Sequence, residues 1–501
     1  MRSAGILMPV SCLPSAYGIG TLGKEAYRFV DFLRDAGCSV WQVLPLQPTS
    51  FGDSPYQSCS AGALNPYFID LDLLAQDGLL AREDYCDLDW GSDPRRVDYG
   101  KQYALRTQVL RKAFSRFDRS VPEFVDFLEK GEYRDYGLFM ALKQRFGGAS
   151  FETWGEYALY DEGKLAAFEN ENRDEVEFWQ FTQYMFLVQW RALKAYANAH
   201  GVEIMGDIPI YVARDSVETW KYGKELFILN GEGFPSEQAG VPPDAFSDTG
   251  QLWGNPVYDW ERMKADGYSW WHERIRSALS LYDILRIDHF IGFVRYYTIP
   301  EGQTDARNGQ WRKGPGADLF RGFEGSRIVA EDLGIVTDEV RAEIDKTGYP
   351  GMKILQHAFD GRPLNEHKPS NYTANCVAYT GTHDNLTLLT RVTEIPEDER
   401  TAFLVDLVHE CRKAGVDLRV DTDRAICHSI LRLLYASEAD TVIFPLQDAL
   451  MMGEEARLNM PGAVTSLNWT FRFLGSDFSE ELCKLLKALA VESGRSRNKS
   501  V

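Results

Sequence analysis

The sequence predicts an α/β protein, a single (β/α)8 TIM barrel with helical and loop insertions and no separate C-terminal domain. Eight short apolar segments that are typical of strands follow one another along the 501 residues. Segments with helical periodicity lie between most of them, as in parallel sheets. Several of the predicted strands end on an acidic residue, and barrels present functional groups at the C-terminal ends of their strands.

The first strand–helix–strand unit lies at the N-terminus. Residues 5–9 are predicted to form the first strand, and residues 25–36 form a helix because their apolar side chains recur on one face. Residues 39–45 are apolar on both faces, which is typical of a parallel strand. The segment 50–66 is dense in Gly, Ser and Pro, so we expect a loop. It carries Tyr56 just beyond the second strand.

Two long segments interrupt the alternation of strands and helices. Residues 70–178 are polar, charged and helical in pattern, and are predicted to form a helical insertion subdomain. A long helix over 179–200 then leads into the third strand at 202–209. Residues 211–260 show little regular pattern, and 230–243 are too rich in Gly and Pro for the interior of an element. We expect 211–260 to be a loop-rich insertion over the active-site mouth.

The last five strands follow in order, and 446–501 leave no room for a second domain. Residues 1–501 are therefore expected to form one catalytic barrel. The predicted strands cover 284–287, 328–331, 352–356, 376–380 and 441–445. The predicted helices cover 268–281, 338–346, 397–414, 423–436 and 479–489.

Composition excludes several classes of partner. Lys and Arg total 54 against 74 Asp and Glu, a formal net charge of −20. This balance argues against binding to a nucleic-acid backbone or to an anionic membrane. The eight cysteines are scattered, with no CxxC pair and no metal-type spacing, which favours reduced thiols in a cytoplasmic protein. Neither a signal peptide nor a membrane-spanning segment is expected.

The predicted fourth and fifth strands end on Asp288 and Glu331. Neighbouring strand ends lie about 5 Å apart, and retaining glycoside chemistry needs two carboxyl groups about 5–5.5 Å apart. Asp288 would be the nucleophile. Arg286 lies two residues before it, on the same side of the strand, and would keep it ionised. Glu331 would be the acid/base, with its pKa raised by the neighbouring negative charges.

Other polar and aromatic residues are expected around these acids. Asp384, beyond the seventh strand, would accept sugar hydroxyls, and the adjacent His383 would donate to another. Tyr56 and Trp253 would stack on sugar rings, although Tyr56 could also serve only in packing. Strand-end acids are often helix caps or surface charges instead.

Three further residues have structural interpretations. We expect Asp332 to cap the turn that follows it. Asp207 ends the third strand and either contacts substrate or only anchors the Arg286 guanidinium. His289 is expected to be a structural histidine.

Seven stretches, in order along nearly the whole chain, resemble one family. They are Ser54-Pro-Tyr-Gln57, Gly206-Asp-Ile-Pro-Ile210, Gln251-Leu-Trp-Gly-Asn-Pro256, Arg286-Ile-Asp-His-Phe290, Ala330-Glu-Asp-Leu-Gly334, Gly381-Thr-His-Asp-Asn385 and Pro445-Leu-Gln-Asp448. The order of the acids resembles the α-amylase clan. The stretches together resemble more closely the 4-α-glucanotransferases of glycoside hydrolase family 77.

The resemblance implies transfer of α-1,4-glucan segments, with Asp288, Glu331 and Asp384 as the catalytic residues and with neither a metal nor an organic cofactor. The partners would be α-1,4-glucans such as maltooligosaccharides, starch or glycogen chains. The implied substrate-binding residues are Tyr56, Asp207, Gln251, Trp253, Asn255, Arg286, His383 and Asn459. An α-glucan hydrolase with the same site and a glucan-binding protein on an inactive barrel remain alternatives.

Overall fold

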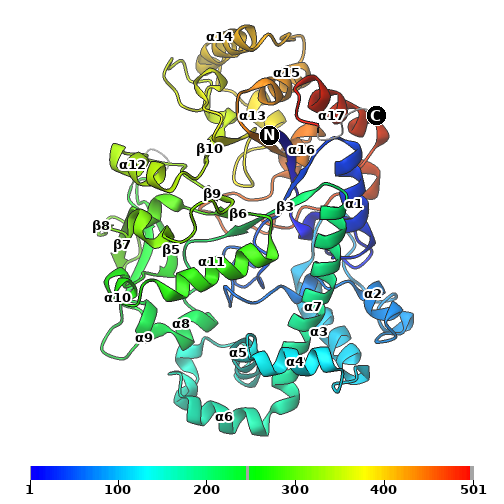
Figure 1. Ribbon diagram of the computed structural model, residues 1–501, viewed down its shortest axis with the longest axis vertical. Coiled ribbons are helices and arrows are strands. Elements are labelled where there is room, and N and C mark those ends of the chain that lie inside the picture. Colours follow the sequence, from blue (N-terminus) through cyan, green and yellow to red (C-terminus); the bar gives the residue numbers. More distant parts are fainter. Residues whose placement is uncertain (1, 244–246, 497–501) are drawn as a thin grey trace.

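The computed structural model describes residues 2–243 and 247–496, and its centre is an eight-stranded parallel sheet (Figure 1). The strands are β1 (Ser3–Leu7), β2 (Val40–Gln42), β3 (Glu203–Ile208), β6 (Ile284–Ile287), β9 (Ile328–Ala330), β10 (Gly351–Ile354), β11 (Cys376–Tyr379) and β12 (Thr441–Pro445). Their order is β10-β11-β12-β1-β2-β3-β6-β9. The backbone N–H of Ala330 donates to the carbonyl of Pro350, just before β10, at 2.9 Å. The two sheet edges therefore meet, and the predicted (β/α)8 barrel and its eight strands are confirmed.

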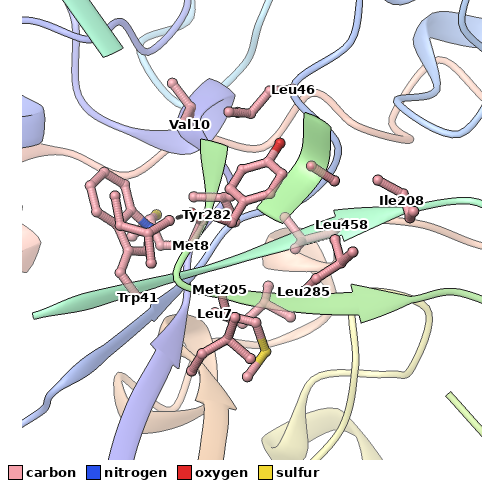
Figure 2. Close-up of a cluster of buried hydrophobic side chains, with 14 of the residues drawn as sticks. Leu7, Met8, Val10, Trp41, Leu46, Met205, Ile208, Tyr282, Leu285 and Leu458 are labelled. Carbon is pink, nitrogen blue, oxygen red and sulfur yellow. Dashed lines mark hydrogen bonds between the residues drawn. The ribbon is translucent and has the colours of Figure 1, made fainter. Parts of the chain in front are cut away.

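Apolar side chains from several strands fill the space around the sheet (Figure 2). Trp41 of β2 is fully buried, and its indole N–H donates to the carbonyl of Met8 at 2.8 Å. Gly206 of β3 lies directly beneath the ring of Tyr282, where a Cβ would come within 2.1 Å of Cδ2. Only glycine allows this close approach, which brings β3 against the segment that leads into β6.

Helices surround the strands (Figure 1). They are α1 (Lys24–Asp35), α7 (Arg173–Ala199), α11 (Ser269–Leu281), α12 (Asp338–Thr347), α14 (Glu397–Ala414), α15 (Asp423–Ala436) and α17 (Glu480–Glu492). The side chains of Thr337, Thr422 and Ser479 accept backbone N–H bonds and so fix the starts of α12, α15 and α17. The predicted helices are present, with ends displaced by a few residues.

The segment between β2 and β3 is largely helical. It contains α2 (Leu71–Gln76), α3 (Tyr99–Arg116), α4 (Pro122–Lys130), α5 (Arg134–Arg145) and α6 (Glu162–Glu171) before α7. Two buried glutamines of α7 bind the backbone on which this segment begins. Gln183 exchanges two hydrogen bonds with Leu64 and Gln189 two with Asp70, at 2.7–3.1 Å. These bonds hold the helical segment against the long helix.

Residues 211–260 are more regular than the sequence predicts. They contain α8 (Val217–Lys221), α9 (Gly223–Leu226), β4 (Glu237–Val241) and β5 (Gln251–Pro256). With β7 (Arg295–Pro300) and β8 (Gln310–Lys313), the last two form an antiparallel sheet of order β5-β4-β7-β8. The expectation that 230–243 holds no element interior is wrong.

The reason is that β4 is specified by tertiary pairing. Its partner β7 follows β6 in the chain, so local sequence does not show the pairing. Gly240 is required there, because a Cβ would lie 2.1 Å from the carbonyl oxygen of Gln251. Over the described residues, no helix is long and apolar enough to cross a membrane.

Candidate active site

Three neighbouring strands bring the predicted acids together. Asp207 of β3 is paired in register with Arg286 of β6, and Ile287 of β6 is paired with Ala330 of β9. Asp288 and Glu331 each follow one residue after that last pair. The two carboxyl groups therefore emerge at the same level, at the C-terminal end of the barrel.

Asp207, Arg286 and Asp288 form a hydrogen-bonded chain. One guanidinium nitrogen of Arg286 donates to both oxygens of Asp207, at 2.8 and 2.7 Å, and the other donates to Oδ1 of Asp288 at 2.9 Å. The expected contact between Arg286 and Asp288 is thus present. The Asp207 side chain is fully buried, whereas that of Asp288 is 27% exposed. Asp207 is therefore linked to the barrel mouth by its hydrogen bonds to Arg286 and Tyr56.

In this hydrogen-bonded series, neighbouring opposite charges oppose the effect of burial on the pKa values of Asp207 and Arg286. Burial raises the pKa of Asp207, and the adjacent Arg286 opposes that rise. Burial would lower the pKa of Arg286, but Asp207 and Asp288 raise it well above its usual value. Arg286 is therefore a fixed cation between two carboxyl groups.

Glu331 is nearly inaccessible and carries a strongly shifted pKa. Its Oε2 accepts the backbone N–H of His289 at 2.7 Å, and its Oε1 accepts that of Leu333 at 2.8 Å. Burial, and after it the charge of Asp288, raise the pKa of Glu331 to about 8, against the opposing effects of Arg286 and the two N–H donors. The sequence predicts the direction of this shift, but burial contributes more than the neighbouring charges. A raised pKa favours the protonated carboxyl group, as a general acid requires.

Asp384 lies beyond β11 and is held by a residue 75 positions away. The side-chain N–H of Asn459 donates to its Oδ1 at 2.6 Å, and Nε2 of His383 lies 3.4 Å from its Oδ2. Arg457 donates to the carbonyls of both Asp384 and Asn459. The carboxyl group of Asp384 remains 44% exposed, so it is available to a ligand.

Three rings form one wall of the site. Tyr56 donates from its hydroxyl to Asp207 at 2.7 Å, and its ring stacks on His383 with centroids 5.0 Å apart. Trp469 packs against Tyr56 at 5.9 Å and against His383 at 5.7 Å. Trp469 is a residue that the sequence analysis missed, because its role arises from contacts with distant segments. Its backbone is left-handed, with φ of 65°, and strain of this kind is enriched at functional sites.

Strand β5 contributes three more of the predicted residues, Gln251, Trp253 and Asn255. The indole N–H of Trp253 donates to the side-chain oxygen of Gln251 at 3.2 Å, and the Trp253 ring is perpendicular to that of His289, with centroids 5.0 Å apart. Asn255 is 5% exposed and donates to the carbonyl of Val212, while its own carbonyl accepts from Gln57 at 3.1 Å. Asn255 therefore ties the β5 segment to the 50–66 loop.

Asp332 differs from the prediction. Its Oδ1 accepts the backbone N–H of Met352 at 2.7 Å, so it binds the start of β10 instead of capping the turn that follows. Within residues 2–243 and 247–496, no group of three or more His, Cys, Asp or Glu side chains could hold a metal ion.

The fold and these side chains define the class of the protein: a (β/α)8 barrel with a carboxylate site at the C-terminal ends of its strands. The family model for 4-alpha-glucanotransferases matches residues 8–476. The 4-alpha-glucanotransferase of Clostridium butyricum is 43% identical over 499 residues, which cover 97% of this chain and 100% of that protein. The corresponding protein of Thermus thermophilus is 42% identical, with 99% of each chain covered.

A solved structure agrees with these sequence matches. Amylomaltase from Streptococcus agalactiae in complex with acarbose superposes with a TM-score of 0.93 at 38% identity, covering 99% of this chain and 100% of that one. The chain belongs to the 4-alpha-glucanotransferase family, glycoside hydrolase family 77. The family and the enzyme class that the sequence predicts are confirmed.

Proposed function

We propose that this protein is a retaining 4-α-glucanotransferase that moves α-1,4-glucan segments through a covalent glycosyl-enzyme on Asp288. One observation carries the proposal. Asp288 and Glu331 follow register-paired residues of adjacent strands, and they differ in environment: Asp288 is partly exposed and bound to Arg286, whereas Glu331 is buried with a raised pKa. Two carboxyl groups on adjacent strand ends, with separate nucleophile and acid roles, suit the retaining mechanism.

In the first step, the Asp288 carboxylate attacks the anomeric carbon of the donor glucan. The glycosidic bond breaks, and Glu331 gives its proton to the departing 4-oxygen. In the second step, Glu331, now ionised, takes the proton from the 4-hydroxyl of an acceptor. The acceptor oxygen attacks the anomeric carbon and Asp288 leaves, so the original α-configuration is restored.

The surrounding residues would bind and orient the sugars. Asp384, held by Asn459, would accept hydroxyl hydrogen bonds next to the reacting carbon, and His383 would donate one. Tyr56 and Trp253 would offer their ring faces, with Gln251 beside the latter.

Arg286 would orient Asp288, and Asp207 would act through Arg286, the anchoring alternative that its full burial favours. Asn255 would act by holding the two loops of the mouth together. The acarbose complex of the Streptococcus agalactiae relative supports a glucan-type ligand.

Transfer and hydrolysis share these acids, so products must separate them. Incubation with maltotriose alone, followed by chain-length analysis, tests the proposal. Glucose together with maltopentaose and longer chains would support transfer. Glucose and maltose with nothing longer would support the α-glucan hydrolase. No turnover of maltotriose or of longer glucans would contradict both and favour a glucan-binding barrel.

A further inference from the structure

His289, directly after Asp288, has a backbone that L-residues rarely adopt. Its φ is 48° and its ψ is 50°, in the left-handed region. A non-glycine residue there is uncommon, and for a β-branched residue the conformation is a genuine outlier. The structure therefore maintains this conformation against a local energetic cost.

The turn at His289 encloses Glu331 with three backbone hydrogen bonds. Glu331 donates its own N–H to the carbonyl of Ile287 at 3.1 Å, and the N–H of Phe290 donates to the carbonyl of Glu331 at 2.9 Å. Between these two, the N–H of His289 donates to the carboxyl Oε2 at 2.7 Å. The left-handed residue thus lies where the chain reverses around the Glu331 carboxyl.

The imidazole of His289 lies between Trp253 and Gly292. Burial lowers the pKa of the ring, against the opposing charge of Asp288, and so favours the neutral imidazole. The imidazole and the ring of Trp253 in β5 are perpendicular, with centroids 5.0 Å apart. Gly292 leaves room for the ring, because a Cβ at that position would come within 2.9 Å of the imidazole Cδ2.

We propose that His289 is a positioning residue, which acts through its left-handed backbone to hold the carboxyl group of Glu331 for proton transfer. This inference rests on the proposed function, since it assumes that Glu331 is the acid/base. It assigns the role to backbone conformation and not to imidazole chemistry.

Substitutions that differ in their tolerance of positive φ test this inference. Glycine adopts the left-handed region at no steric cost and asparagine tolerates it, whereas valine strongly disfavours it. His289→Gly and His289→Asn should keep kcat/KM for maltotriose disproportionation within about fivefold. General acid–base catalysis contributes about 10²–10⁴-fold, so His289→Val should lose at least 100-fold. His289→Ala should fall between them and serves if the valine variant does not fold.

A donor substrate whose leaving group needs no protonation distinguishes a positioning role of His289 from a general loss of active-site structure. In α-maltotriosyl fluoride the leaving group departs without protonation, so the first step does not require Glu331 as an acid. The pre-steady-state burst of fluoride should therefore stay within about fivefold of wild type in His289→Val or His289→Ala, while maltotriose turnover falls. A merely structural defect would slow both.

Glu331→Gln is the reference variant. If it retains maltotriose turnover, Glu331 is not the acid/base and the proposed function itself fails. If it loses turnover but keeps the fluoride burst, the proposed role of Glu331 stands. In that case, a valine or alanine variant that keeps maltotriose turnover, or that loses the burst as well, overturns only the role of His289.

Discussion

Replacing Asp207 by Asn tests whether the hydrogen bonds that link Asp207 to Asp288 through Arg286 hold Asp288 in position. The substitution keeps the size of the side chain but removes its charge. It also turns one acceptor oxygen into an N–H donor. Since Arg286 donates to both oxygens and Tyr56 donates to one of them, at least one existing contact would become donor against donor.

The magnitude follows from burial. The side chains of Asp207 and Arg286 are 0% and 4% exposed, so solvent screens this pair little. A hydrogen bond to a charged group contributes about 1.5–3 kcal/mol. If the free energy of this hydrogen bond serves to orient Asp288 in the transition state, its loss should lower kcat/KM about 10- to 150-fold, at about 1.4 kcal/mol per factor of ten.

Asp283 provides a matched control at the opposite end of β6. It accepts hydrogen bonds from the Ile204 backbone at 2.8 Å, from Lys194 at 2.7 Å and from Asn198 at 2.8 Å. Asp283→Asn should lower the thermal midpoint but leave kcat/KM for maltotriose disproportionation within about twofold. The reasoning is refuted if Asp207→Asn also keeps kcat/KM within twofold, because Arg286 would then hold Asp288 without its buried partner.

Three further predictions concern Glu331, Asn459 and Trp469. Because Glu331 must be protonated to release the donor and its pKa is raised to about 8, kcat/KM should fall as pH rises through about 8; a decline complete by pH 6 would contradict this assignment. Asn459→Ala removes the 2.6 Å donor to Asp384 and should lower kcat/KM about tenfold, close to the value of one such bond; unchanged steady-state kinetics would argue against it. Trp469→Phe should keep kcat/KM near wild type, whereas Trp469→Ala should lower it about tenfold, because the ring supports Tyr56; equal rates for the two variants would exclude that role.

The barrel could be predicted because its strands carry local signals. Parallel strands are covered on both faces, so short apolar segments such as residues 441–445 stand out from the helices between them. The acids could be placed because a carboxylate directly after such a segment must emerge at the barrel mouth. Arg286 and Asp288 share one side of a strand, so their contact followed from spacing alone.

What the sequence does not show depends on contacts between distant segments. The pairing of β4 with β7 joins segments on either side of β6, and Gly-rich sequence there suggests a loop. Trp469 reaches Tyr56 across more than 400 positions. The left-handed backbone of His289 could not be predicted from residue type, because histidine is enriched at positive φ but only a few per cent of non-glycine residues adopt it. In each case tertiary structure overrides local preference.

In the proposed mechanism, Asp288 becomes covalently bonded to the transferred glucan. Glu331→Gln treated with α-maltotriosyl fluoride should form the glycosyl-enzyme, because fluoride leaves without an acid, and should resolve it slowly for lack of a base. Mass spectrometry of the intact protein and then of its proteolytic peptides would locate the adduct. We expect one maltotriosyl group on Asp288. An adduct on Asp384, or fluoride release with a product of inverted configuration and no adduct, would contradict it.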